Sequence, residues 1–317
     1  MKHANDGFWA LLTCITLLIS CVIYDYAGNP KNTHSKVIGV TCMTLNNPFY
    51  EVINNELRKQ TEANHDQLLI LDPQLDAQKQ GEQIEQMVEK RVDAIILNPV
   101  DSSALEAPLK KAKEADIPVI VIDSPVQHEE LIDTTIVSDN YEAGKLAARA
   151  MMHDLDSAQI LLLEHTQADS GRDRILGFLS EIKDHPEYQV VDRKECLGQL
   201  EKAMPAAADA LEAHPQINVV MALNDPSALG AAAAAESMSR DDLFVYGVDG
   251  TPDFKSKMDE NKVLHATVAQ SPYTIARKAA KSAYDLMDGK SVESFQLVDV
   301  ALITPDNLDS YSRENWQ

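Results

Sequence analysis

From residue 36 to the end of the chain, short apolar runs rich in β-branched residues alternate with longer amphipathic segments. This alternation is typical of a parallel β-sheet whose strands are joined by crossover helices. In the first half, the pattern predicts strands over residues 37–42, 67–71, 94–97 and 119–122, and helices over residues 49–63, 77–90 and 103–115. Each strand and its following helix take about thirty residues, the size of one right-handed βαβ turn.

The same alternation restarts in the second half. Predicted strands cover residues 135–137, 160–163, 188–191, 219–222, 244–248 and 266–269, and predicted helices cover 141–152, 172–182, 200–213, 226–238 and 272–287. This is too many strands for a single sheet, so we predict two doubly wound α/β lobes. Pro205 leaves two alternatives for the helix that contains it, a kink or a later start. The alanine-rich runs 206–210 and 231–235 are interpreted as small-residue helix faces packed close to a sheet.

The N-terminal segment is apolar from residue 8 to residue 24, and Lys2 and the α-amino group are the positive charges before it. This pattern predicts a membrane-directed segment, either an uncleaved anchor or a cleaved signal. A third alternative is a lipoprotein signal, because residues 18–21 resemble a bacterial lipobox with Cys21 as the lipidated residue. Against it, residues 22–24 continue the apolar run. All three alternatives place the body outside the cytoplasm, with residues 25–35 as a spacer.

Composition narrows the class of partner. The chain of 317 residues is 44% hydrophobic and 25% charged, which is typical of a globular protein with one or two sizeable cores. Its net charge of -22 repels phosphates over most of the surface, so nucleic acid is not an expected partner. The four cysteines, at positions 14, 21, 42 and 196, lack the paired short spacing of a zinc site, and we expect no disulfide, metal or cofactor.

Polar residues follow the predicted strands in both halves. Ligands of open parallel sheets bind outside the carboxyl ends of the strands, so these residues are candidates for a site. Taken singly, an Asn, Asp or Ser before a proline is more simply a helix cap. However, amides, carboxylates and an arginine recur at equivalent strand ends, together with two aromatic residues. Sugar recognition needs this set, because hydroxyl groups require donors and acceptors and flat rings cover C–H faces. The residues that follow the predicted strands in this way are Asn46, Asn47, Phe49, Tyr50, Asp123, Ser124, Glu164, Arg172, Asn224, Asp225, Asp249, Gln270 and Ser271.

A family resemblance rests on the ordered stretches VTCMTLNNPFYEVI, AIILNPVDSSAL, IPVIVID, IVSDNYEAGKLAA, MALNDPSALGA, VYGVDGTPD and ATVAQSP. The chain resembles ribose/galactose-type periplasmic binding proteins, the solute-binding components of ABC sugar importers, from about residue 36 to the end. The resemblance implies ligand contacts at Asn47, Phe49, Tyr50, Asp123, Arg172, Asn224, Asp249 and Gln270, with Ser124 beside them. It also implies three strands crossing between the lobes, near Ser138, near Gln270–Ser271 and near Asp299–Val300. The implied lobes are residues 36–137 with 271–299, and residues 138–270 with 300–317.

Two departures from the ribose-type pattern concern the ligand. Those proteins carry an arginine directly after the aspartate of the fourth strand, whereas this chain has Ser124. They also carry an aromatic residue over the second face of the sugar, and residues 197–200 contain none. Both changes remove bulk, so we expect a roomier pocket than a ribose site. A hexose, a modified sugar, a polyol or a small oligosaccharide fits this expectation, and ribose is put in doubt.

Other functions with this fold or chemistry are disfavoured. A sugar-responsive repressor needs a basic helix-turn-helix, which the N-terminal segment does not supply. The sequence has no glycine-rich nucleotide-binding loop and no nucleophile elbow, so we expect that the protein is not an enzyme. Among the histidines, His165 is expected nearest to the cleft. Asp123 and Asp249 are interpreted as hydroxyl ligands and not as a glycosidase pair. We expect a monomer that closes on its ligand, with an ABC permease as partner; a membrane sensor kinase or chemoreceptor is the alternative.

Overall fold

The computed structural model describes residues 35–317. The predicted membrane segment, residues 8–24, and the candidate lipidation site Cys21 lie outside the described residues. Residues 37–317 form one compact unit, and its sheets and hydrophobic cores are complete within that unit. In the part of the chain that the structure describes, no helix has both the length and the apolar character needed to cross a membrane.

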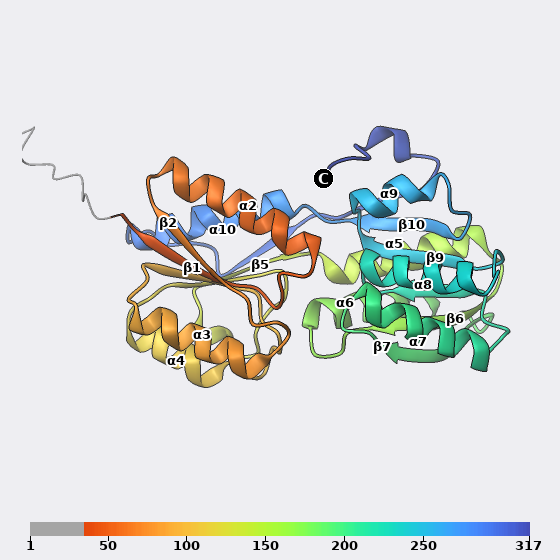
Figure 1. Cartoon of the computed structure of the whole chain (residues 1–317), viewed down its shortest axis with the longest axis horizontal. Coiled ribbons are helices and arrows are strands. Elements are labelled where there is room, and N and C mark those ends of the chain that lie inside the picture. Colours follow the sequence, from red (N-terminus) through yellow and green to blue (C-terminus); the bar gives the residue numbers. More distant parts are fainter. Residues whose placement is uncertain (1–34) are drawn as a thin grey trace, which may run out of the picture. The chain divides into compact units, whose positions relative to one another are not determined.

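The first sheet has six parallel strands in the order β11-β5-β4-β3-β1-β2. They are β1 (Val37–Thr41), β2 (Gln67–Leu71), β3 (Ala94–Leu97), β4 (Val119–Ile122), β5 (Thr134–Ser138) and β11 (Phe295–Val298). One face of this sheet is covered by α2 (Pro48–Ala63) and α10 (Pro272–Met287), and the other by α3 (Ala77–Glu89) and α4 (Glu106–Glu114), as Figure 1 shows. Because both faces are covered, β3 and β4 are buried at every residue and consist of apolar residues only.

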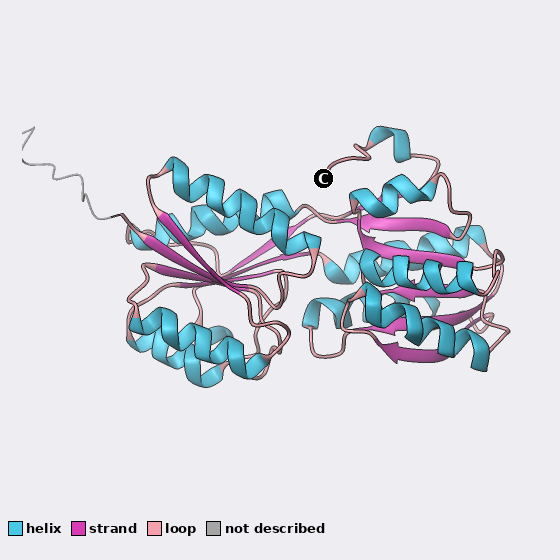
Figure 2. Ribbon diagram, viewed as in Figure 1, coloured by secondary structure: helices cyan, strands magenta, loops and turns pink. Residues whose placement is uncertain are grey.

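The second sheet has the order β12-β10-β9-β8-β6-β7. Its strands are β6 (Ala158–Glu164), β7 (Tyr188–Glu195), β8 (Val219–Ala222), β9 (Phe244–Asp249), β10 (Leu264–Ala269) and β12 (Ala301–Ile303), which runs antiparallel to β10. One face is covered by α5 (Asn140–Asp154) and α6 (Asp169–Ile182). The other is covered by α7 (Leu200–Ala213), α8 (Asp225–Ser237) and α9 (Pro252–Met258), as Figure 2 shows.

The chain passes from one sheet to the other three times: between β5 and α5, between β10 and α10, and between β11 and β12. The predicted class of two parallel-sheet α/β lobes therefore agrees with the observed topology. The sequence pattern did not predict α9, β11 or β12, which are all short. Helix α6 begins at Asp169, three residues before its predicted start at residue 172. Pro205 lies inside α7, so the alternative of a later helix start is excluded.

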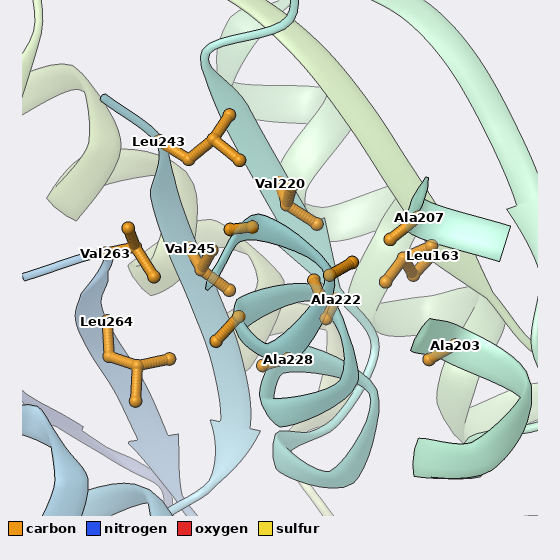
Figure 3. Packing of buried hydrophobic residues seen from close by; sticks show 14 of the residues in the cluster. Leu163, Ala203, Ala207, Val220, Ala222, Ala228, Leu243, Val245, Val263 and Leu264 are labelled. Atoms are coloured by element: carbon orange, nitrogen blue, oxygen red, sulfur yellow. The ribbon is translucent and has the colours of Figure 1, made fainter. Parts of the chain in front are cut away.

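Alanine side chains pack the helices of the second lobe closely against its sheet. Ala203, Ala207 and Ala210 are buried on α7, and Ala228 is buried on α8. Figure 3 shows these helices beside the strands that carry Val220 and Val245. The interpretation of the alanine-rich runs as small-residue packing faces is confirmed.

Glycines bring α5 and α6 into backbone contact. A Cβ atom at Gly144 would lie 1.8 Å from the carbonyl oxygen of Arg174, and one at Gly177 would lie 2.0 Å from that of Tyr141. Larger residues therefore cannot occupy these positions without moving the helices apart. This contact fixes the position of α6, and α6 carries Arg174 toward the space between the lobes.

Candidate functional site

A cavity of about 30 Å³ lies between the lobes, where the carboxyl ends of strands from both sheets face each other. Of the residues proposed from the sequence, it is lined by Asn47, Phe49, Tyr50, Asp123, Asn224, Asp249 and Gln270. It is also lined by His165, Ser170, Arg174, Leu197, Gly198 and Gln199. The strand-end rule therefore brings together side chains that lie up to 223 positions apart in the sequence, from Asn47 to Gln270.

The first lobe supplies two aromatic rings and a carboxylate. Asn47 caps α2, because its Oδ1 accepts a hydrogen bond from the Phe49 backbone N–H at 2.9 Å. The Phe49 and Tyr50 rings meet edge to face with centroids 5.5 Å apart, and both are buried. The Tyr50 hydroxyl donates to Asp123 Oδ2 at 3.0 Å, and Asn98 Nδ2 donates to the same oxygen at 3.1 Å.

The second lobe supplies a buried arginine and its partners. Arg174 Nε donates to Asn140 Oδ1 at 2.9 Å, and Arg174 Nη1 donates to the Leu223 carbonyl at 2.9 Å. The same Nη1 lies 3.5 Å from Asp249 Oδ1. Gln270 Nε2 donates to that Asp249 oxygen at 2.7 Å. The arginine is thus held in one orientation beside the carboxylate.

Gln270 leaves an acceptor atom unpaired. Its side chain is 2% exposed, yet its Oε1 atom has no hydrogen-bond partner within the described residues. An unpaired buried acceptor costs about 1–3 kcal/mol, so such atoms are rare unless they serve a purpose. Because Gln270 lines the cavity, a hydroxyl donor placed there would pair this oxygen.

The cavity is electrostatically unusual, because several carboxyl groups are buried around one guanidinium. Burial raises the pKa of Asp123 and of Asp249, and the Arg174 charge acts in the opposite direction on both. Burial also raises the pKa of Asp225, which lies behind the cavity and accepts hydrogen bonds from Thr267 Oγ1 and Thr251 N at 2.6 and 2.7 Å. Hydroxyl groups of a neutral ligand can donate to these carboxyl oxygens without adding another charge.

Backbone strain coincides with the same residues. Asp123 has a φ angle of 64° and Asp249 one of 140°. Side chains other than glycine rarely adopt such angles, which cost about 1–3 kcal/mol each and cluster at functional sites. Leu197, a third cavity-lining residue, has a φ angle of 54°. The strain therefore supports a functional role for both aspartates.

The structure corrects the placement of the arginine. Arg172 does not line the central cavity; its side chain is 46% exposed and pairs with Asp169 at 2.6 Å in the first turn of α6. Because α6 begins at Asp169, Arg172 is already helical, and two residues along a helix turn the side chain by about 200°. Arg174 therefore faces the cavity and Arg172 faces solvent.

Ser124 contacts the other lobe beside the cavity. Its side chain is fully buried, and its Oγ accepts a hydrogen bond from the Ser170 backbone N–H at 3.2 Å. Helix α6 packs directly against this short side chain, and Leu197 and His165 line the cavity.

Several site residues were missed by sequence reasoning. Arg174 precedes the buried residues Ile175 and Phe178 of α6, so helical periodicity places it near the buried face. Asn98 directly follows β3, and the strand-end rule alone indicates it. His165 was noted and does line the cavity; burial lowers its pKa. The cysteines that the structure describes, Cys42 and Cys196, are free and buried.

Comparison with known proteins assigns the family. A family model described as a periplasmic binding protein domain matches residues 38–291. The chain belongs to this periplasmic binding protein family. Among relatives, the ribose import binding protein of Bacillus subtilis is 34% identical over 289 residues, which are 89% of this chain and 93% of that protein.

Solved structures of periplasmic binding proteins share the fold. An ABC transporter solute-binding protein from Bacillus halodurans with bound myo-inositol is 27% identical, with a TM-score of 0.82 over 88% of this chain and 98% of that chain. A second, from Mycobacterium smegmatis with bound glycerol, is 26% identical, with a TM-score of 0.85 over 90% of this chain and 100% of that chain. The predicted family and its two-lobed α/β fold are therefore confirmed.

Proposed function

We propose that this protein binds a neutral sugar or polyol between its lobes and delivers it to an ABC-type importer, acting as a binding protein and not as an enzyme. The main observation behind this proposal is a buried cavity lined by polar side chains from both lobes. One of these side chains, Gln270, has an Oε1 atom without a hydrogen-bond donor. The family match supports this function, because a relative is a ribose import binding protein and a structural neighbour holds myo-inositol.

The proposed ligand contacts divide between rings and polar groups. Phe49 and Tyr50 cover C–H faces of the ligand, and the carboxyl and amide groups pair with its hydroxyls. Arg174 takes the role that the sequence analysis gave to Arg172. The full set is Asn47, Phe49, Tyr50, Asp123, Ser124, Arg174, Asn224, Asp249 and Gln270.

Hinge closure is the proposed mechanism. Hydrogen bonds that join the lobes beside the cavity are Ser102 Oγ to Asp169 Oδ1 at 3.0 Å, Ser170 N to Ser124 Oγ at 3.2 Å and Asn46 Nδ2 to Gln199 Oε1 at 3.3 Å. The cavity lies between the lobes and most of its lining residues are buried, so these bonds must break and the lobes must separate for a sugar to enter. Residues 36–137 with 271–299 and residues 138–270 with 300–317 are the proposed moving lobes. The ligand then shifts the equilibrium toward the closed form, because it contacts both lobes only there.

The body is proposed to lie outside the cytoplasm as a monomer tethered to the membrane through residues 8–24. The apolar segment and the family support this location. Fractionation of cells that express the full chain tests it, and mass spectrometry of Cys21 separates the three forms of the N-terminus. A diacylated Cys21 identifies a lipoprotein, an intact N-terminus identifies an anchor, and a soluble shortened chain identifies simple secretion and refutes the tether.

Isothermal titration calorimetry of residues 36–317 is the direct test of ligand binding. The panel contains ribose, galactose, allose, xylitol, myo-inositol and glycerol. We expect micromolar or tighter binding of at least one compound. Asp249→Ala should weaken this binding by about 30-fold or more, because a ligand hydroxyl then loses a buried hydrogen-bond partner worth about 2 kcal/mol. Tight binding of ribose would overturn the expectation that ribose is disfavoured. If no sugar or polyol binds, the proposed function is wrong.

A further inference from the structure

A second cavity, of about 240 Å³, opens beside the central one. Asn47, Gly198 and Gln199 line both cavities, so single residues separate them. A hexose in its six-membered ring form takes roughly 180 Å³, if each of its six carbon atoms with one oxygen occupies the volume of one water molecule. The second cavity is therefore large enough for one sugar ring.

The walls of this second cavity combine apolar and polar groups. Trp316 and the prolines Pro48, Pro226 and Pro252 supply flat apolar surfaces. Glu201 and Asp253 supply carboxylates, and Asn46 supplies an amide that donates to Glu201 Oε1 at 3.2 Å. Apolar faces beside hydroxyl acceptors match the two sides of a sugar ring, which presents C–H groups on its faces and hydroxyl groups at its edge.

The charges around the second cavity exclude an anionic occupant. Its lining includes the carboxylates Glu201 and Asp253 but no lysine or arginine. The helices α2, α8 and α9 begin at this cavity with a proline in the first turn, and the side chains of Asn47, Asn224 and Thr251 already cap them. In each helix the proline removes one amino-terminal N–H and the cap pairs with another, so few are left for an anion. A neutral ring fits, whereas a phosphorylated one does not.

Trp316 is held in place from both lobes. The Nζ of the fully buried Lys255, on α9, donates to the carbonyl oxygen of Asn315 at 2.6 Å. The indole of the next residue, Trp316, belongs to the core of the first lobe, and its centroid lies 5.6 Å from that of the Phe49 ring. Trp316 therefore borders the second cavity and contacts a ring of the central site at the same time.

We propose that the second cavity is a subsite for a second sugar ring, so that the preferred ligand is a neutral disaccharide or glycoside. Its first ring occupies the central site, and its second ring lies against Trp316. This inference rests on the proposed function. It gives the segment that follows β12 a role in specificity, because this segment carries Trp316.

The test is calorimetry on residues 36–317, which form a complete compact unit. The monosaccharide of the panel that binds most tightly is compared with its methyl and phenyl glycosides and with disaccharides that carry it at the non-reducing end. We expect at least one disaccharide to bind about tenfold more tightly than the monosaccharide, because an aromatic contact with its burial is worth about 1.4 kcal/mol. Trp316→Ala should reduce this ratio to about one, and Trp316→Phe should retain part of it.

Two further variants separate the subsite from a general loss of structure. Asp253→Ala removes an exposed carboxylate of the second cavity and should lower the affinity for the disaccharide alone. Met238→Ala is the control, because Met238 lies at the far end of α8, roughly 20 Å along the helix from the cavity. The ratio of the two affinities should not change in this control.

The possible outcomes are distinct. If a monosaccharide binds but no disaccharide binds more tightly, the subsite is refuted and the proposed function stands. If phenyl glycosides bind more tightly and disaccharides do not, the cavity takes an apolar group and the second sugar ring is refuted. If no sugar or polyol binds at all, the proposed function itself fails.

Discussion

The two arginines of α6 offer a matched test of the site geometry. Arg174→Ala removes a guanidinium that is 4% exposed, donates to Asn140 and Leu223, and lies 3.5 Å from Asp249. Removing a buried guanidinium with these partners costs about 3–5 kcal/mol, because Asn140, Leu223 and Asp249 are left buried without compensation. Arg172→Ala removes an exposed pair with Asp169, which is worth about 0–1 kcal/mol.

The assay is urea denaturation of residues 36–317 without ligand, followed by calorimetry with the sugar that binds. We expect Arg174→Ala to lower the free energy of unfolding by about 3–5 kcal/mol and to abolish measurable binding. Arg172→Ala should change both by less than about 1 kcal/mol. Arg174→Lys, which keeps the charge but loses the planar fork, should fall between them.

Two results would contradict this reasoning. Equal losses in Arg172→Ala and Arg174→Ala would mean that burial does not distinguish the two side chains. Normal ligand affinity in Arg174→Lys would mean that the guanidinium donors make no specific contact with the ligand.

Four other predictions concern stability. Burial raises the pKa of Asp249 to about 8, so without ligand the folded state keeps a proton that the unfolded state loses above about pH 4. The free energy of unfolding should therefore fall as the pH rises from about 4 toward 8. Asp249→Asn should reduce this pH dependence when it is measured by urea denaturation at several pH values. Gly177→Ala should cost about 3 kcal/mol, because its Cβ would lie 2.0 Å from the Tyr141 carbonyl oxygen. Gly81→Ala, whose Cβ would lie 3.6 Å from its nearest neighbour, should instead raise the melting temperature by removing a helical glycine. Tyr50→Phe should lower the free energy of unfolding by about 1–2 kcal/mol, because Asp123 loses a donor; an unchanged urea midpoint would contradict this.

The sequence by itself determined the fold class and most of the strand ends. Buried parallel strands must be apolar on both faces, so runs such as those of β3 and β4 are visible in the sequence alone. Helix caps also depend only on neighbouring residues, so the sequence indicates them directly. Asn47 and Asn224 each cap a helix and also line the cavity, so one side chain can have both positions. The short elements β11 and β12 carry no such signal, because three or four residues show no periodicity.

Only the tertiary structure decided which side chains face the cleft. Arg172 and Arg174 differ by two positions, and an error of three residues in the start of α6 exchanged their roles. The second cavity depends on Trp316, which reaches Phe49 from the opposite end of the sequence through a tail held by Lys255. Hydrophobic pattern and capping are properties of neighbouring residues, so the sequence determines them, whereas the direction of a side chain across a gap depends on how two separately packed sheets meet.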